Sequence, residues 1–196
     1  METTLSPPEN FGIVEPLVYR SSTITPENLP FIVQLRLKTV VHLSPDITQR
    51  AVLEFFEEHG IELMHLGMKS WRPSGWQISE ELVKNSLEII LDSRYHPVLI
   101  TCTSGVHQTG TVVGCLRRLQ DWCFTSTLGE LRTYASNARA RYVNETFVEY
   151  FDPDLVSLPL DAPFWFKNQQ AWLERDRKEG DRNSKSKPYQ VYKLSN

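Results

Sequence analysis

Cysteine is scarce in this chain, which has three cysteines, Cys102, Cys115 and Cys123, among 196 residues. The number is odd and the spacing lacks the paired pattern of a structural metal site, which argues against a disulfide framework and against zinc ligation. Free thiols in a reducing compartment are the simplest interpretation. We therefore expect a cytoplasmic protein that needs no metal and no cofactor.

Long apolar runs are also missing. No uninterrupted stretch approaches the roughly 20 apolar residues that span a bilayer, and the opening METTLSPPENFG lacks the basic and then apolar pattern of a secretory signal. A formal net charge of −3 excludes the overall basic field that draws proteins onto polyanions. We expect neither a membrane nor a nucleic acid among the partners.

The composition that is present is that of a globular domain, with 40% hydrophobic and 23% charged residues. The length suits one domain with a hydrophobic core and a modest extension. We place the domain at residues 1–152. Residues 153–196 hold an aromatic cluster at Phe164, Trp165 and Phe166 and then a charged, basic end. We expect this extension to be partly disordered, or docked on the domain or on a partner.

Strand-like and helix-like patterns alternate along the domain. Strands are predicted at residues 18–22, 39–44, 61–67 and 97–101, and helices at residues 25–37, 46–60, 79–93, 110–122, 126–140 and 142–151. This alternation favours an α/β fold with a central, mostly parallel sheet flanked by helices. Within it, His42 and His65 are predicted to be hydrogen-bonded sheet residues. Asp46 and Gln49 have the spacing of a capping box that starts a helix.

The segment PVLITCTSGVHQTG, residues 97–110, carries the chemistry. Cys102 ends an apolar strand just before a helix, where the helix N-terminus and the loop amides favour a thiolate and can cradle an anion. Gly105 permits the left-handed turn that such a loop uses. Thr109 is placed to offer its hydroxyl to the cysteine sulfur. These features are typical of a cysteine-dependent phosphatase.

Two requirements of that chemistry are missing from the sequence. The residues between Cys102 and Thr109 include no arginine or lysine: they are Thr103, Ser104, Gly105, Val106, His107 and Gln108. The neutral amide of Gln108 cannot reproduce a cationic fork that grips two phosphate oxygens. An acid for the leaving group is absent between residues 67 and 79. Asp46 and Glu80 remain as candidates, although both are explained more simply as residues at helix starts.

The cysteine loop resembles that of the plant and fungal atypical dual-specificity phosphatases, a branch of the protein tyrosine phosphatase superfamily that includes the fungal oxidant-induced cell-cycle arrest (Oca) group. NFGIVEPLVYRSS near the start, GCLRRLQDW after the loop and FVEYFD support the likeness, which spans about residues 7–152. The resemblance implies a protein tyrosine phosphatase-like fold. For the active members of this group, the substrates are inositol pyrophosphates or phosphotyrosine peptides, and the resemblance implies the same substrate classes here. The resemblance also connects the chain with an oxidative stress response.

The resemblance also assigns the loop position by position, against the form His-Cys-x-x-Gly-Lys-His-Arg-Thr-Gly. Cys102 matches the nucleophile. The frame of the loop is matched by Gly105, His107, Thr109 and Gly110. The departures are Thr101 for the histidine, Val106 for the lysine and Gln108 for the arginine. The scaffold is therefore expected to persist without its two cations.

Three functions remain open. The first is a catalytically inactive pseudophosphatase that binds protein partners, plausibly paralogous phosphatase-like proteins, and retains a site for a phosphate or inositol phosphate anion. The second is a weak cysteine-dependent phosphatase in which His107 or a tail lysine replaces the missing cation. The third is a redox sensor in which another thiol resolves oxidised Cys102.

Two expectations concern the surroundings of the loop. Trp71 and Trp76, with Arg72 between them, either shape the rim of the pocket or pack locally. Arg20 either braces the cysteine loop or pairs on the surface.

Overall fold

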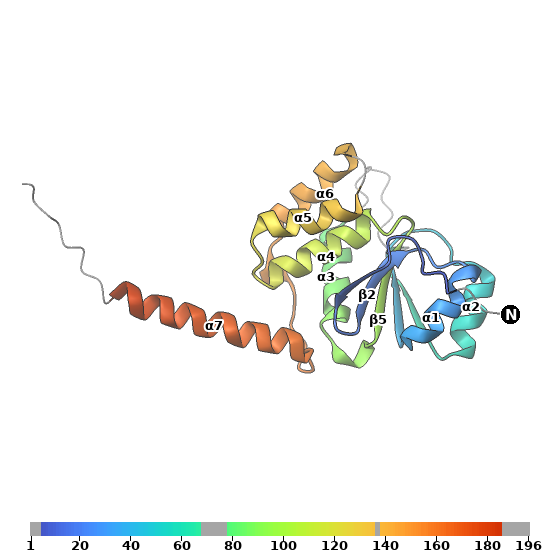
Figure 1. Ribbon diagram of the computed structural model, residues 1–196, viewed down its shortest axis with the longest axis horizontal. Helices are drawn as coiled ribbons and strands as arrows, with labels where there is room; N and C mark the ends of the chain where they lie inside the picture. Colours follow the sequence, from blue (N-terminus) through green and yellow to red (C-terminus); the bar gives the residue numbers. More distant parts are fainter. Residues whose placement is uncertain (1–4, 68–77, 136–137, 186–196) are drawn as a thin grey trace, which may run out of the picture.

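Five strands form one sheet in the order β1-β2-β5-β3-β4. The computed structural model describes residues 5–67, 78–135 and 138–185 (Figure 1). The strands are β1 (Gly12–Glu15), β2 (Val18–Ser22), β3 (Thr39–His42), β4 (Glu62–His65) and β5 (Val98–Cys102). β1 runs antiparallel to β2, and the remaining neighbours pair in parallel. The mostly parallel sheet predicted from the sequence is confirmed.

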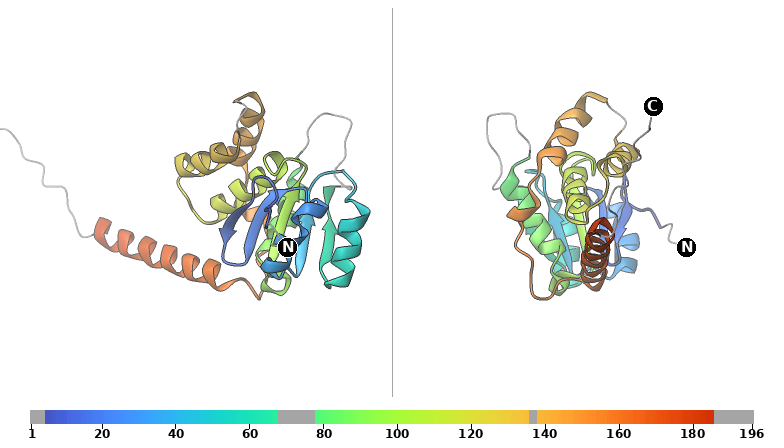
Figure 2. Two further views of the ribbon diagram at one scale, coloured as in Figure 1. Left: turned by 45° about the vertical axis from the view of Figure 1, so that its right-hand side comes forward. Right: turned by 90° about the vertical axis from the view of Figure 1, so that its left-hand side faces the viewer.

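Helices cover both faces of this sheet (Figure 2). They are α1 (Leu29–Leu35), α2 (Arg50–Glu58), α3 (Glu80–Ile90), α4 (His107–Leu119), α5 (Phe124–Tyr134), α6 (Ala138–Tyr150) and α7 (Phe164–Lys185), with short 3-10 turns at Pro26–Asn28, Ser93–Tyr95 and Pro153–Leu155. α1 and α2 pack on one face, and α3 to α6 contribute to the core on the other. Because β5 has helices on both sides, all five of its residues are buried, as expected of a central parallel strand.

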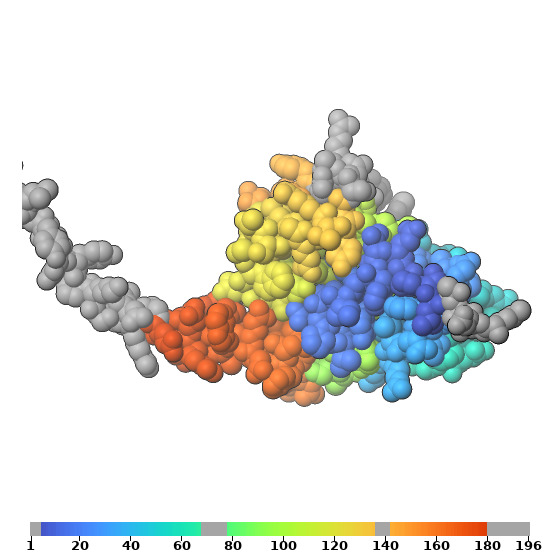
Figure 3. All heavy atoms as spheres, viewed as in Figure 1, coloured from blue at the N-terminus to red at the C-terminus, as the bar shows by residue number. Residues whose placement is uncertain are grey.

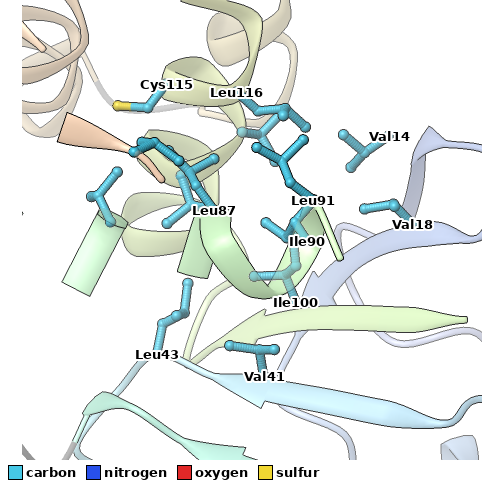
Figure 4. Close-up of a cluster of buried hydrophobic side chains, with 14 of the residues drawn as sticks. Val14, Val18, Val41, Leu43, Leu87, Ile90, Leu91, Ile100, Cys115 and Leu116 are labelled. Atoms are coloured by element: carbon cyan, nitrogen blue, oxygen red, sulfur yellow. The ribbon is translucent and has the colours of Figure 1, made fainter. Parts of the chain in front are cut away.

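Alternate residues of the strands supply the two cores. Val41 and Ile100 face α3 and α4, where Leu87 and Leu116 are also buried (Figure 4). Residues one position away face α1 and α2: Val40 and Leu99 pack with Ile32, Val52 and Phe56. This alternation is the two-residue period of a strand. β5 is the middle strand of the sheet and lies between the two cores, so Cys102 at its end lies near the centre of the domain.

Several local features differ from those predicted from the sequence. β1 was not predicted. α4 begins at His107 rather than at Gly110. The predicted helix start at Asp46 is wrong: α2 begins at Arg50, after an extended Gln49 that makes no side-chain cap. The physical reason is that the carboxylate of Asp46 accepts a hydrogen bond from the hydroxyl of Thr103 instead of from helix amides.

The segment after residue 152 contributes to the core before it leaves the domain. Ala162 and Phe166 are buried in the larger core cluster, and Trp165 packs against it. Gln169 and Gln170 donate hydrogen bonds to the backbone carbonyls of residues 120 and 119, at the end of α4. α7 then extends away from the rest of the molecule (Figures 1 and 3). The basic end, residues 186–196, lies outside the described residues.

Within the described ranges, no helix combines the length and apolar character needed to cross a membrane.

Candidate active site

The cysteine loop, residues 102–109, connects the central strand to α4. Cys102 is fully buried at the end of β5, and α4 begins five residues later at His107. Gly105 adopts a φ of +69°, and a Cβ built there would lie 2.5 Å from the backbone nitrogen of Ser22. The loop therefore needs glycine at this position for two reasons, its left-handed backbone and its close approach to β2.

The chain's own oxygens satisfy three backbone amides of the loop. The Thr103 amide donates to Ser44 Oγ at 2.8 Å. The Gly105 amide donates to the carbonyl of Cys102 at 3.2 Å. The Val106 amide donates to Ser104 Oγ at 3.2 Å. Two of these three acceptors are serine hydroxyls, which can rotate, so an incoming anion has neutral groups to displace.

Arg20 lies beneath the loop. Its Nη2 donates to the carbonyl of Gly105 at 2.8 Å, and its guanidinium carbon lies 3.7 Å from the centre of the Tyr134 ring. The side chain is 1% exposed. Burial lowers the pKa of Arg20, while nearby charges, including that of Cys102, oppose this shift. Of the two expectations for Arg20, bracing of the loop is the one that the geometry favours.

The first turn of α4 contains Gln108, which stands where the resemblance expects an arginine. Gln108 is buried in this turn. Thr109 is fully buried, and within the described residues its hydroxyl has no hydrogen-bond partner, so the predicted bond to the sulfur of Cys102 is not formed. His107 Nδ1 lies 3.3 Å from the side-chain nitrogen of Asn144 on α6. Sequence reasoning missed Asn144, because no local pattern connects α6 to the loop.

A polar network occupies the carboxyl ends of β3 and β5, beside the loop. Thr103 Oγ1 lies 2.9 Å from Ser44 Oγ and also donates to the carboxylate of Asp46. Thr101 Oγ1 and His42 Nδ1 are 2.9 Å apart, and His42 Nε2 lies 3.1 Å from the carbonyl of Asp46. Asp46 is therefore the one of the two candidate acids that the fold brings to the loop.

The two histidines of the sheet are held as the sequence predicted. His65 Nε2 lies 2.7 Å from the carbonyl of Ser44, and the rings of His42 and His65 are 4.8 Å apart. Burial, followed by the charge of His65, lowers the pKa of His42. A lowered pKa favours the neutral ring, which suits a residue that hydrogen-bonds to its sheet neighbours.

Other candidates lie elsewhere. Glu80 begins α3 and lines a separate hollow of about 230 Å³ with α6 residues, including Tyr142 and Phe147. The start of α7 contacts the end of α4 opposite the loop, and the helix then extends away from the domain (Figure 1), so the fold does not bring the tail lysines on α7 to the loop. Trp71, Arg72 and Trp76 lie outside the described residues.

The three cysteines are free. Cys115 is fully buried in α4, and this burial raises its pKa well above the usual range. Cys123 is exposed, and a hydrogen bond with Ser126 lowers its pKa. A buried thiol with a high pKa is a poor nucleophile, so the geometry gives no support to Cys115 as the thiol that would resolve an oxidised Cys102.

The whole arrangement matches known proteins. The fungal protein named OCA1 from Mycosarcoma maydis is 40% identical over 78% of this chain and 96% of its own length. Inositol diphosphatase DSP1 from Oryza sativa subsp. japonica is 43% identical over 77% of this chain and 68% of its own. The crystal structure of the core catalytic domain of the PP-IP phosphatase SIW14 from S. cerevisiae, in complex with citrate, matches with a TM-score of 0.70 at 38% identity, covering 77% of this chain and 90% of that one.

A model of the tyrosine phosphatase family matches residues 5–169, which include every strand, the cysteine loop and the start of α7. The resemblance to the atypical dual-specificity phosphatases and to their fungal Oca group is thereby confirmed. With the fold, the loop and the sequence in agreement, this chain belongs to the tyrosine phosphatase family.

Proposed function

We propose that this protein is a catalytically inactive phosphatase that acts as a binding or scaffolding subunit with related phosphatase-like proteins. The observation that carries the proposal is Gln108, which lies in the first turn of α4 where the family resemblance places an arginine. A neutral amide cannot grip two oxygens of a phosphoryl group as a guanidinium does. Loss of a charge-assisted hydrogen bond weakens binding by about 1.5–3 kcal/mol. Transition-state arginines in phosphoryl transfer contribute roughly 10³–10⁵ in rate, so catalysis suffers more than binding.

The charge around the loop supports the same conclusion. The carboxylate of Asp46 accepts a hydrogen bond from Thr103, the residue that follows Cys102. A negative charge at this place opposes the approach of a phosphate. The loop nevertheless keeps its shape, because serine hydroxyls and a backbone carbonyl satisfy the amides of Thr103, Gly105 and Val106. A loop that is stable without a ligand suits a retained scaffold.

The extension supports a role in protein binding. Phe164 and Trp172 on α7 are 77% and 60% exposed, and Leu160 just before the helix is 97% exposed. Large apolar side chains that gather on a protruding element often mark contact surfaces. We propose phosphatase-like proteins related to this chain as the partners, and the cytoplasm as the compartment in which its three free thiols remain reduced.

A weak cysteine-dependent phosphatase is the second candidate, and the position of Asp46 favours it. The carboxyl group of Asp46 lies beside Thr103, close to the loop, and in its protonated form it could donate a proton to a leaving group. The names of two relatives, an inositol diphosphatase and a PP-IP phosphatase, suggest inositol pyrophosphates as substrates. Phosphotyrosine is the alternative substrate class.

Turnover measurements separate the two candidates. The purified wild type, Cys102→Ser, Gln108→Arg and the double variant Cys102→Ser/Gln108→Arg are assayed with an inositol pyrophosphate and with an aryl phosphate. We expect no Cys102-dependent turnover in the wild type, a gain in Gln108→Arg, and loss of that gain in the double variant. Turnover by the wild type that disappears in Cys102→Ser would overturn the inactive assignment.

Complex formation tests the scaffolding role. The wild type and a Phe164→Ser/Trp172→Ser variant are mixed with purified related phosphatase-like proteins and measured by analytical ultracentrifugation. We expect a stable complex with the wild type and a weaker one with the variant. Recovery of separate monomers in every mixture would contradict a scaffolding role.

A further inference from the structure

Among the residues whose burial the structure describes, two arginines are buried, and they differ in how their charge is compensated. Arg117 on α4 is 3% exposed and uses all three guanidinium nitrogens. Its Nε and Nη2 donate to both carboxylate oxygens of Glu130 at 2.7 and 2.9 Å. Its Nη1 donates to Glu15 at 2.5 Å and to Gln120 at 2.8 Å, and its Nη2 also donates to the carbonyl of Val14. Two carboxylates therefore compensate this charge.

Arg20 is compensated less completely, because Glu130, which Arg117 already binds, opposes the lowering of the Arg20 pKa but makes no hydrogen bond with Arg20 among the described residues. Arg20 is 1% exposed, and its hydrogen bond from Nη2 to the Gly105 carbonyl is made to a neutral acceptor. Over the ranges 5–67, 78–135 and 138–185, its Nε and Nη1 have no partner. A guanidinium cannot lose its proton in a protein, and a buried charge without an ion pair in direct contact is unfavourable. An anion bound near Arg20 would therefore be stabilised by this charge.

The fold directs this charge at the cysteine loop. In the parallel pairing of β2 with β5, Arg20 lies opposite Ile100, and Ser22 lies opposite Cys102. Since paired residues share a face and alternate residues of a strand do so too, Arg20 and Cys102 project on the same side of the sheet. A Cβ at Gly110 would lie 3.6 Å from Nη2 of Arg20. The guanidinium thus lies between β2, the loop and the first turn of α4.

Tyr134 holds the guanidinium in this place. Its ring covers Arg20 from the end of α5, and its hydroxyl packs so closely against Gly12 of β1 that a Cβ there would overlap it. The cation–π contact lowers the energy of the charge in part. A ring face carries no net negative charge, however, so the contact does not replace a counter-ion.

The hydrogen bond to Gly105 also sets the direction of a donor. The peptide bond between Gly105 and Val106 is trans, so its carbonyl and its N–H point in opposite directions. With the carbonyl held by Arg20, the Val106 N–H points away from the guanidinium, where Ser104 Oγ accepts it at 3.2 Å. The serine hydroxyl is thus the acceptor that an incoming anion would have to displace at this amide.

We propose that Arg20 is a positioning residue and counter-charge that lets the cysteine loop bind the dianionic phosphate group of a ligand although Gln108 is neutral. The proposal deepens the proposed function and rests on its claim that the loop survives as a binding element. Arg20 acts through the Gly105–Val106 peptide and through its buried positive charge. The phosphate replaces the hydroxyl of Ser104 at the Val106 amide.

Two substitutions separate the charge of Arg20 from its hydrogen bond. Arg20→Lys keeps a positive charge, and Arg20→Gln keeps a neutral donor for the Gly105 carbonyl. Inorganic phosphate is titrated into each variant and followed by the amide NMR signals of residues 103–108, and folding is checked by circular dichroism. Because a charge-assisted bond is worth more than a neutral one, we expect Arg20→Gln to bind phosphate about 10-fold more weakly than the wild type. Arg20→Lys should stay within about threefold.

The control is Phe56→Ala, which removes an uncharged side chain buried on the other face of the sheet. It should lower stability while leaving the phosphate affinity unchanged. A purely structural role for Arg20 predicts instead that affinity follows stability in all three variants, and that result would overturn the proposal. If Arg20→Gln does not fold, Gly12→Ala, which displaces Tyr134 from the guanidinium, takes its place and is expected to weaken phosphate binding.

The phosphate-binding experiment and the turnover assay test separate claims. Phosphate binding by the wild type that is equally strong in Arg20→Gln would overturn the role of Arg20 and leave the inactive assignment standing. Cys102-dependent hydrolysis by the wild type would overturn the inactive assignment and leave the role of Arg20 standing. If the wild type does not bind phosphate, the proposed role of Arg20 in phosphate binding is wrong.

Discussion

The carboxylate of Asp46 accepts a hydrogen bond from the hydroxyl of Thr103, so an acidic side chain from the segment between β3 and α2 lies at the first residue after Cys102. In an inactive binding protein this charge repels a phosphate. In a weak phosphatase the same carboxyl group, in its protonated form, would donate a proton to the leaving group. A substitution of Asp46 therefore tests how this charge affects phosphate binding.

Asp46→Asn removes the charge and keeps a hydrogen-bond acceptor for Thr103. Because like charges repel, we expect the variant to bind inorganic phosphate about threefold more tightly than the wild type at low ionic strength, with the difference shrinking as salt is added. Calorimetric titration at two salt concentrations measures it. The control is Asp152→Asn, which removes an exposed carboxylate at the start of a 3-10 turn. Weaker binding by Asp46→Asn would contradict the repulsion.

Gly105→Ala tests the shape of the loop. The substitution meets an unfavourable φ of +69° and places a Cβ 2.5 Å from the backbone nitrogen of Ser22. We expect it to lower the free energy of unfolding by about 1–3 kcal/mol. Gly129→Ala is the matched control, because Gly129 lies in the interior of α5 with open space around it. It should raise stability by up to about 1 kcal/mol. Urea denaturation compares the two, and equal effects would contradict the strained turn.

Arg117→Gln tests the buried ion pairs. Removing this guanidinium leaves Glu15 and Glu130 without their shared cation, with side chains only 18% and 22% exposed. We expect a loss of about 3 kcal/mol in the free energy of unfolding. Arg50→Gln removes the exposed pair with Glu54 and should change stability by no more than about 0.5 kcal/mol. Losses of similar size in the two variants would show that burial does not set the strength of the pair.

The pH dependence of stability depends on the buried histidines. Burial lowers the pKa of His42 and of His96, so the unfolded chain binds protons more readily than the folded chain. Their contribution is fully present above the ordinary histidine pKa of about 6.5 and is lost as the pH falls below it. We expect the free energy of unfolding to decline between about pH 6.5 and pH 5. His42→Gln should reduce this decline, and His42→Gln/His96→Gln should reduce it further. An unchanged slope in the double variant would exclude both residues as its source.

The sequence was sufficient for the elements whose periodicity is strong. β3 and β5 have β-branched apolar runs. α3 has Ser79 as its N-cap, and the Ser79 hydroxyl accepts a hydrogen bond from the Leu82 amide. β1 was missed because its four residues alternate in burial too briefly to form a pattern, and its pairing with β2 is what makes it a strand. Periodicity reports local structure and not the partner of a strand.

The candidate site likewise has a part that local sequence patterns predict and a part that depends on contacts between distant residues. Cys102, Gly105 and Gln108 are neighbours in sequence, and their place between a strand and a helix follows from local patterns. The contacts that decide their chemistry join distant positions. Arg20 and Gly105 are separated by 85 residues, and Asp46 and Thr103 by 57. For Asp46 the local capping pattern was misleading, because its carboxylate accepts a hydrogen bond from the distant Thr103 and does not cap a helix.

Helix α4 has a spatial consequence for any complex that this protein forms. It carries the cysteine loop at its first residue, and the glutamines of α7 contact the backbone carbonyls at its last. A 13-residue helix is about 20 Å long. A protein that binds the projecting tail would thus make its contacts about one helix length from the cysteine loop, at the opposite end of α4.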